Sequence, residues 1–294
     1  MQIRRLASAV DIARRNPRLF AQRVGAHVKH AVLPLKQPRT SAVGRGVQFR
    51  FDPGIDAMVG QMWAGSYAPA VVSAIRRLLD RGDTAIDVGA NIGYISAVML
   101  AEVGPAGEVH AFEPVAEYAL RLEELARLNE NHRLVVQRIA LSDAEGTASI
   151  AVSRGNLGWN TMVPGLMRST DLRYSEDVRT TRLDAYFLAE ALAPSLIKID
   201  VEGFELAVLD GLSRYLSTGA RPAVICEVAP MAYPRLGRHV ADLADWVSAF
   251  GYRALDPVDL RTPIVLADLT STTDIVFLPQ HRSRDESASK DTSR

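Results

Sequence analysis

One stretch, DTAIDVGANIGYISAVMLAEVG over residues 83–104, limits the possible folds of this chain more than any other. TAIDV is typical of a short buried strand and GANIG of a turn, and the residues after them predict a helix with Ile95, Val98 and Met99 on one face. A strand that turns through glycines into a helix begins many ligand-binding α/β sheets. We therefore expect strands and helices to alternate.

The alternation continues to residue 279. Strands rich in Ile and Val with helices between them predict an α/β fold, in which a mostly parallel sheet carries helices on both faces. Ligands bind to such sheets at the carboxyl ends of the strands, so candidate site residues should lie there. Strands are expected at residues 84–88, 107–114, 134–142, 146–153, 195–203, 222–229 and 273–279. Helices are expected at residues 67–82, 92–102, 116–130, 204–216 and 240–251.

Composition limits the partners and the compartment. The chain has 34 basic and 34 acidic residues, and this zero net charge disfavours nucleic acid as a partner. The single cysteine, Cys226, cannot form an internal disulfide, and no apolar run reaches the roughly 18–20 residues of a membrane span. We expect a cytoplasmic protein, and the sequence gives no oligomeric state.

Basic residues are concentrated in residues 1–45, which carry ten Lys or Arg and one acid. They predict a basic N-terminal helical arm, interrupted at Pro17, and a linker over residues 32–46. Two interpretations of the arm stay open: peripheral contact with an anionic membrane or acidic partner, or packing on the main domain. The main domain is expected at residues 46–280, followed by a disordered tail at residues 281–294 that lacks large apolar residues.

The loop after the first strand, Asp87-Val88-Gly89-Ala90-Asn91-Ile92-Gly93, lacks the G-x-G-x-x-G pattern of dinucleotide sites. A carboxylate at Asp87 is unfavourable beside a pyrophosphate and favourable beside an ammonium or sulfonium group. These features indicate S-adenosylmethionine, with the ligand's own carboxylate at the amide groups that begin the helix.

Two later strand ends support a nucleoside ligand. Glu113 closes the second strand, where a carboxylate can accept hydrogen bonds from both ribose hydroxyls. The third strand ends at ALSD, which should place residues 140–143 beside the adenine. The residues expected to bind the cofactor are Asp87, Gly89, Asn91, Gly93, Glu113, Ser142 and Asp143.

Four segments carry a resemblance to a known family. DVGANIGYISAVML, AFEP, ALSDAEG and LIKIDVEGFELAVLDG, in this order, resemble the FkbM-type methyltransferases over about residues 66–280. The resemblance implies the class I methyltransferase (Rossmann-like) fold, dependence on S-adenosylmethionine, and methylation of a hydroxyl on a sugar, polyketide or related metabolite. It does not extend to residues 1–45 and implies no role for them.

Lys198, Asp200 and Glu202 alternate at the end of the strand in SLIKIDVEG, which puts their side chains on one face. An acceptor hydroxyl is a poor nucleophile until a nearby carboxylate removes its proton. We expect Asp200 to be this base or to orient the acceptor, with Glu202 and Lys198 in support. One alternative is Mg²⁺ bound by Asp200, Glu202 and Glu227. The others are structural: a Lys198–Asp200 pair, and a Glu202 that only stabilises the next helix.

The segment of residues 154–177 is longer than an ordinary connection, and we expect it to select the acceptor. Trp159 can stack on a sugar, and Asn156 and Asn160 can hydrogen-bond to hydroxyls, with Glu227 on a neighbouring strand end. A surface loop with Trp159 packed in the core is the alternative.

The expected function is S-adenosylmethionine-dependent O-methylation of a sugar, glycolipid or polyketide-type hydroxyl, so the expected partner is a small-molecule or glycan acceptor. The basic arm favours a lipid-linked acceptor among these. A non-catalytic S-adenosylmethionine-binding or scaffold protein is one alternative, and a nicotinamide-dependent oxidoreductase is another. Apart from the Mg²⁺ alternative, no metal is expected.

Overall fold

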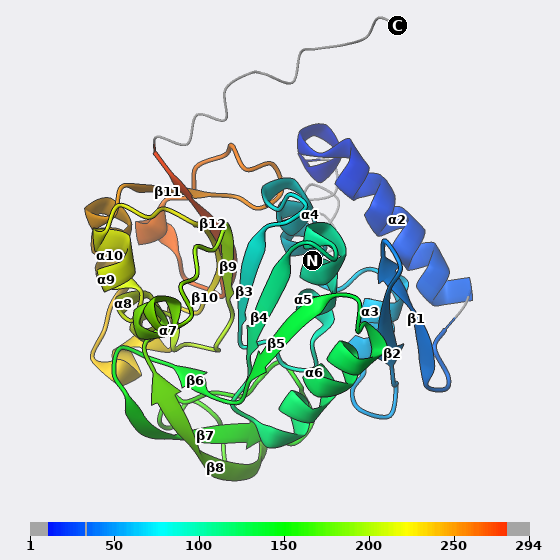
Figure 1. Cartoon of the computed structure of the whole chain (residues 1–294), viewed down its shortest axis with the longest axis horizontal. Coiled ribbons are helices and arrows are strands. Elements are labelled where there is room, and N and C mark those ends of the chain that lie inside the picture. The colour runs from blue at the N-terminus through cyan, green and yellow to red at the C-terminus, as the bar shows by residue number, and fades with distance from the viewer. Residues whose placement is uncertain (1–10, 33, 281–294) are drawn as a thin grey trace, which may run out of the picture.

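The computed structural model describes residues 11–32 and 34–280, which form a central sheet covered by helices (Figure 1). The predicted disordered tail, residues 281–294, lies outside the described residues, as do residues 1–10 of the basic arm. In chain order, the seven strands of the sheet are β3 (Thr84–Val88), β4 (Glu108–Phe112), β5 (Arg133–Gln137), β9 (Leu196–Ile199), β10 (Ala223–Val228), β11 (Tyr252–Leu255) and β12 (Thr273–Pro279).

The strands lie in the order β11-β12-β10-β9-β3-β4-β5, and all are parallel except β12, which runs antiparallel to both neighbours. The chain leaves β3 for β4 and β5 on one side and then crosses to β9 and β10 on the other. The winding direction therefore reverses between β3 and β9, and a crevice forms outside the strand ends at such a point. The predicted mostly parallel, class I methyltransferase sheet is confirmed.

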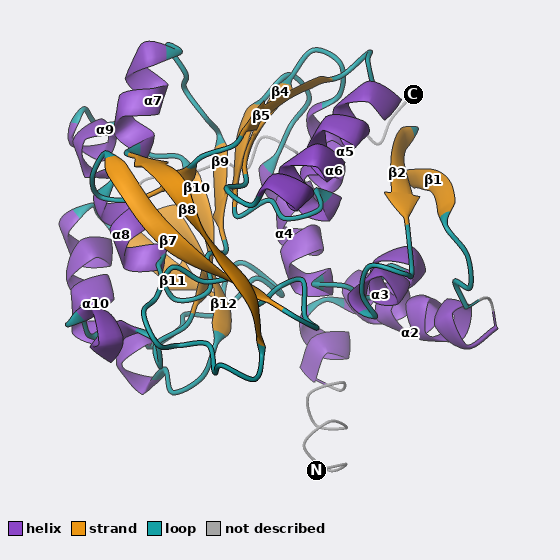
Figure 2. Ribbon diagram, turned by 90° about the horizontal axis from the view of Figure 1, so that it is seen from below, coloured by secondary structure: helices purple, strands orange, loops and turns teal. Residues whose placement is uncertain are grey.

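Helices cover both faces of the sheet, as predicted (Figure 2). Successive residues of a strand point to opposite faces, and in β3 Ala85 is buried in one apolar core whereas Ile86 and Val88 are buried in the other. The first core is covered by α4 (Pro69–Leu78), α5 (Tyr94–Val103) and α6 (Ala116–Leu128), and the second by α7 (Leu183–Ala189), α8 (Glu205–Asp210), α9 (Ser213–Ser217) and α10 (Val240–Ala249).

A second, three-stranded sheet follows β5 in the order β6-β8-β7. β6 is Ala140–Leu141, and β7 (Gly146–Ser153) and β8 (Leu172–Thr181) form a long antiparallel pair. The loop predicted at residues 154–177 is therefore too long, because residues 172–177 belong to β8 and the connection is residues 154–171. β8 was not predicted because its polar sequence, LRYSEDVRTT, has a single buried residue, Val178.

The described part of the N-terminal arm is helical, and a strand hairpin begins within the predicted linker. Residues 11–15 are helical, the helix breaks at Asn16, and α2 (Pro17–Val32) follows, in agreement with the interruption predicted at Pro17. Instead of a linker, β1 (Arg39–Gly44) pairs with β2 (Val47–Phe51) in a hairpin that packs against α5. None of the residues of β1 is buried, so no apolar alternation marked it in the sequence. The boundary predicted after residue 45 falls in the turn of this hairpin.

The described part of the arm packs on the main domain. Ile12 and Leu19 are buried, and the Arg15 guanidinium forms ion pairs with Asp256 at 2.8 Å and Asp259 at 2.7 Å. These contacts agree with the second interpretation of the arm. Within residues 11–32 and 34–280, no helix is both long enough and apolar enough to cross a membrane.

Candidate functional site

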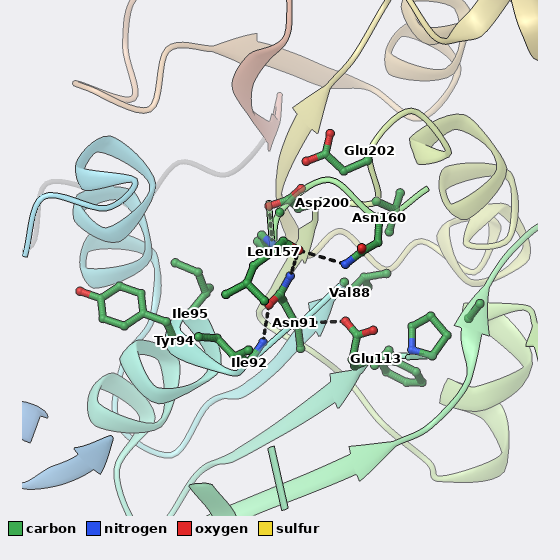
Figure 3. Close-up of a pocket in the computed structure, with 18 of the residues that line it drawn as sticks. Val88, Asn91, Ile92, Tyr94, Ile95, Glu113, Leu157, Asn160, Asp200 and Glu202 are labelled. Carbon is green, nitrogen blue, oxygen red and sulfur yellow. Dashed lines mark hydrogen bonds and ion pairs between the residues drawn. The ribbon is translucent and has the colours of Figure 1, made fainter. Parts of the chain in front are cut away.

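A first cavity opens where β3, β4 and β9 end, at the point where the winding of the sheet reverses (Figure 3). The space inside it is about 860 Å³ when open solvent is included. Its walls come from the loop after β3, the end of β4, α3 (Met58–Ala64), β6 and the connection of residues 154–171. Its charged lining residues are Glu113, Lys198, Asp200 and Glu202.

Two glycines shape the loop after β3. Gly89 lines the first cavity, has a φ of 73°, and would place a Cβ 1.9 Å from the carbonyl oxygen of Asp200. Only glycine therefore lets this loop pass so close to the residues that follow β9. Gly93 was predicted to contact the cofactor, but in the described chain it does not line the cavity. Its φ is 89° and a Cβ would lie 2.8 Å from Leu122, so Gly93 serves the packing of α5 on α6.

Glu113 closes β4 and lines the first cavity, where backbone groups hold both of its carboxylate oxygens. The N–H of Asn91 donates to Oε2 at 2.8 Å, and the N–H of Val115 donates to Oε1 at 2.9 Å. Burial raises the pKa of Glu113 to about 7, and the two backbone hydrogen bonds oppose that rise. Each oxygen keeps a further lone pair, so the carboxylate can still accept two hydroxyls.

Asp87 does not lie where the sequence placed it. It is fully buried, accepts a hydrogen bond from Ser96 Oγ at 2.6 Å, and lies 3.8 Å from Lys198 Nζ. Burial raises its pKa, and Lys198 and Ser96 oppose the rise. Asp87 is not among the described residues that line the first cavity. It can therefore act on a ligand there only indirectly, through its ion pair with Lys198.

Ser142 and Asp143, which were predicted to bind the cofactor, are also not among the described residues that line the first cavity. Ser142 Oγ donates to Asp143 Oδ1 at 3.0 Å, and the cavity wall is made by the residues just before them, Ile139, Ala140 and Leu141. The prediction is displaced because β5 ends at Gln137, several residues before the end of the strand expected at residues 134–142.

A second cavity adjoins the first and shares its wall. Tyr67, Gly158, Lys198, Asp200 and Glu202 are among the residues that line both. The second cavity encloses about 840 Å³, open solvent included, and extends over the ends of β9 and β10 and the start of β12. Its charged lining residues are Lys198, Asp200, Glu202, Glu227 and Asp274.

Lys198 stands between the two cavities with its ammonium group on two carboxylates. Its Nζ lies 2.9 Å from Asp200 Oδ2 and 3.8 Å from Asp87 Oδ1. Burial lowers the pKa of Lys198, but Asp200 and Asp87 together raise it by more, so its net pKa is above the usual value. Lys198 therefore stays charged, and the predicted pairing with Asp200 is present at the wall that both cavities share.

Carboxylates crowd the second cavity. Burial raises the pKa of Glu202 to about 8, with Asp200 and Glu205 adding to the rise. Burial also raises the pKa of Asp274 to about 6. The pKa of Glu227 is raised as well, by burial and by the neighbouring charge of Asp200. Glu227 and Asp274 face each other across the β10–β12 pair, an unfavourable arrangement for two like charges. The predicted Mg²⁺ set also converges, since Asp200, Glu202 and Glu227 each offer an oxygen within 4.8 Å of the other two.

The connection of residues 154–171 reaches both cavities, but its predicted acceptor residues differ in position. Asn156 lines the second cavity and Asn160 lines the first. The amide of Asn160 is already engaged, because Oδ1 accepts from Ser153 N at 2.9 Å and Nδ2 donates to Leu157 O at 2.9 Å. Trp159 is half-buried and is not among the described residues that line either cavity. Its position therefore gives no support to the predicted stacking on a sugar.

Sequence patterns did not predict Met58, Tyr67 or Asp274 at this site. Met58 lies in α3, which is too short for a helical period to stand out in the sequence. Asp274 was missed because β12 is antiparallel, so its first residues, and not its last, lie where the parallel strands end. The acid at the start of TDIVFLP is a signal that could have found it.

The strand order, the glycine loop after β3 and the carboxylate that closes β4 define a class I methyltransferase-type α/β protein. A family model described as Methyltransferase FkbM domain matches residues 87–254, which is more than half of the chain. This protein belongs to that family, and the resemblance found in its sequence is confirmed.

Several solved structures are similar to this chain. An FkbM methyltransferase from Methylobacillus flagellatus is 16% identical with a TM-score of 0.42, and the match covers 74% of this chain and 54% of that chain. A SAM-dependent O-methyltransferase from Thermotoga maritima is 13% identical, with a TM-score of 0.38 and coverage of 74% and 67%. Aeropyrum pernix fibrillarin, solved with natively bound S-adenosyl-L-methionine, is 13% identical, with a TM-score of 0.38 and coverage of 68% of each chain.

This chain thus spans 54% of the length of the Methylobacillus flagellatus protein that it matches. No curated protein matches the chain.

Proposed function

We propose that this protein transfers a methyl group from S-adenosylmethionine to a hydroxyl oxygen of a sugar, glycolipid or polyketide-type acceptor. Membership of the FkbM family supports the methyltransferase chemistry. The observation that carries the proposal is the pair of adjoining cavities that share Lys198, Asp200 and Glu202. A group transfer needs two ligands to meet at one point, and a shared wall provides that point.

The residues of the first cavity fit the donor. Glu113 presents a carboxylate with two free lone pairs, which suits the paired hydroxyls of a ribose. Ile139 and Leu141 add apolar surface suited to a flat base. Gly89 brings backbone close to the cavity, whereas Ala90 and Asn91 stand where a pyrophosphate site has a second glycine.

S-adenosylmethionine, when bound, supplies an electrophilic methyl group, and the acceptor oxygen bonds to it as the carbon–sulfur bond breaks with its electron pair on sulfur. The hydroxyl proton goes to a carboxylate of the chain. Asp200 is the leading candidate because it lines both cavities and Lys198 holds its Oδ2 at 2.9 Å. Glu202, with a pKa of about 8, is protonated at neutral pH and can donate a hydrogen bond to the acceptor.

Charge supports a neutral acceptor over an anionic one. Of the described residues that line the second cavity, four are carboxylic acids and Lys198 is the basic one, and its ammonium already pairs with Asp200. A phosphate or carboxylate there would meet the charge of Asp274, whose pKa is about 6, and the described lining offers it no free cation. Hydroxyl groups suit such a lining, because carboxylates accept hydrogen bonds from them.

Mg²⁺ on Asp200, Glu202 and Glu227 is the alternative to this direct proton transfer. Because Lys198 already occupies one oxygen of Asp200, we expect methyl transfer to survive complete removal of divalent metal by EDTA. Loss of activity with EDTA and recovery on adding Mg²⁺ would instead assign the metal role to these three carboxylates.

The proposal is tested by incubating the purified full chain with S-adenosylmethionine and a panel of neutral sugars, glycolipids and polyketides, and measuring S-adenosylhomocysteine and methyl ether formation. Calorimetric titration with S-adenosylmethionine and with NAD accompanies it. Binding of NAD alone would favour the oxidoreductase. Binding of S-adenosylmethionine without turnover of any acceptor would favour the non-catalytic alternative.

A further inference from the structure

The peptide of Leu157 and Gly158 forms part of the wall between the two cavities. Leu157 lines the first cavity and Gly158 lines both. Besides bonds from Asn156 and Asn160 within the connection of residues 154–171, the wall is held by hydrogen bonds from outside it, so its position also depends on other parts of the chain. Two of these contacts come from Asp56 and Asn91.

Asp56 ties this wall to the start of α3 with one carboxylate. Its Oδ1 accepts the N–H of Met58 at 2.6 Å, and its Oδ2 accepts the N–H of Leu157 at 3.1 Å. Met58 itself lines both cavities. One side chain thus sets the distance between two walls that come from segments about one hundred residues apart in sequence.

Asn91 ties the same wall to the carboxylate that closes β4. Its backbone N–H donates to Glu113 Oε2 at 2.8 Å, and its side-chain Nδ2 donates to Leu157 O at 2.6 Å (Figure 3). Its φ of 52° is in the left-handed region, which turns the backbone N–H toward Glu113 and the amide toward Leu157. A single residue therefore contacts both the donor-binding carboxylate and the Leu157 carbonyl, which precedes Gly158, a residue that lines both cavities.

We infer that Asp56 and Asn91 are positioning residues that couple the two cavities, so that a donor bound on Glu113 fixes the Leu157–Gly158 wall before the acceptor enters. The inference rests on the proposed function, since it takes the first cavity as the donor site. It predicts ordered binding, donor first, and a donor that strengthens acceptor binding. By reciprocity, the acceptor strengthens donor binding by the same factor.

The first test is Asp56→Asn in the full chain. An asparagine has one acceptor oxygen, and the short bond to Met58 N two residues ahead retains it, so Leu157 N loses its partner. We expect the acceptor KM to rise about 10- to 100-fold, the effect of one lost hydrogen bond to a charged group. The donor Kd should change less than about threefold, because Asp56 does not contact Glu113.

Asp52→Asn is the matched control. Asp52 makes a similar turn, with Oδ1 accepting the N–H of Gly54 at 3.0 Å, but in the described structure it has no hydrogen bond to residues 154–171 and lines neither cavity. It should leave the acceptor KM at the wild-type value. An equal rise in both variants, or an unchanged KM in Asp56→Asn, would overturn the positioning role.

The second test needs no acceptor and uses hydrogen exchange with S-adenosylhomocysteine as the probe. Asn91→Gly keeps the left-handed backbone and the N–H to Glu113 but removes the amide that reaches Leu157. In the wild type the probe should slow exchange both in residues 87–115 and in residues 154–161. In Asn91→Gly it should slow exchange in residues 87–115 only.

The outcomes are distinguishable. Equal protection of residues 154–161 in Asn91→Gly and wild type would overturn the coupling and leave the proposed function intact. A wild-type chain that does not bind S-adenosylhomocysteine at all would overturn both. Circular dichroism of each variant shows whether it folds, and the protection of residues 87–115 in Asn91→Gly confirms that its first cavity is intact.

Discussion

Replacement of Glu113 by glutamine is the most direct test of how this chain holds a donor. The Glu113 side chain is 5% exposed and accepts backbone N–H groups at 2.8 and 2.9 Å, one on each oxygen. Glutamine keeps one acceptor oxygen and turns its NH₂ group toward the other N–H donor, so one hydrogen bond to a charged acceptor is lost and a donor is left unpaired. The ribose hydroxyls lose a charged acceptor as well.

A lost hydrogen bond to a charged group is worth about 1.5–3 kcal/mol. The backbone bonds to Glu113 are present without donor, so the change in donor binding comes from the ribose hydroxyls, and we expect a loss of about 1.5–3 kcal/mol, which is about a 10- to 150-fold rise in Kd. Isothermal titration calorimetry of the full chain with S-adenosylhomocysteine measures it. Thermal unfolding by circular dichroism shows whether the variant is folded.

Glu117→Gln is the matched control, because Glu117 lies four residues further along the chain, in the first turn of α6, and pairs on the surface with Arg173 at 2.6 Å. Its donor Kd should equal that of the wild type. A Glu113→Gln variant that is folded and binds within about threefold of the wild type would refute the assignment of Glu113 to the donor.

Three further predictions follow from the site and the arm. Asp200→Asn should lower kcat by about 100-fold or more, the usual effect of removing a general base, while the donor Kd stays near that of the wild type, and near-normal turnover would remove Asp200 from the mechanism. Without ligand, the free energy of unfolding should fall as pH rises from 7 to 8. In the folded chain Glu202 has a pKa of about 8 and still binds a proton over this range, whereas in the unfolded chain it is ionised, so rising pH favours the unfolded state. Urea unfolding at the two pH values measures this fall in stability, and Glu202→Gln should make it smaller. A wild-type stability that rises with pH would contradict the raised pKa of Glu202. Because α2 has no acidic residue and exposes Val24 and Val28, the chain should sediment with anionic phospholipid vesicles at low salt and not with neutral ones, and a chain that ignores both would end the membrane hypothesis.

The fold was largely predictable because its central strands are buried on both faces. Strands such as Thr84–Val88 and Ala223–Val228 are mostly apolar, with one acid each, and they lie between segments with a helical period, so these patterns are local. Strands with little burial left no such pattern, which is why Arg39–Gly44 and Leu172–Thr181 were missed. Their pairing depends on partners elsewhere in the chain.

The site was predictable where a residue ends a parallel strand and less so elsewhere. Glu113 and Asp200 line the cavities because β4 and β9 stop just before them. Asp87 belongs to β3 itself, so its side chain is buried within the sheet, and the sequence could not separate these cases. Asp274 was missed because the direction of β12 is a tertiary property, although the acid at the start of TDIVFLP is visible in the sequence.

The central claim is that the donor occupies the first cavity, with its ribose on the Glu113 carboxylate and Asp200 on the shared wall beside the acceptor. A crystal structure of the full chain with S-adenosylhomocysteine tests it most directly. Both ribose hydroxyls should lie within hydrogen-bond distance of Glu113, and the adenine should lie against Ile139 and Leu141. A nucleoside bound anywhere else, or a first cavity closed by side chains, would contradict it.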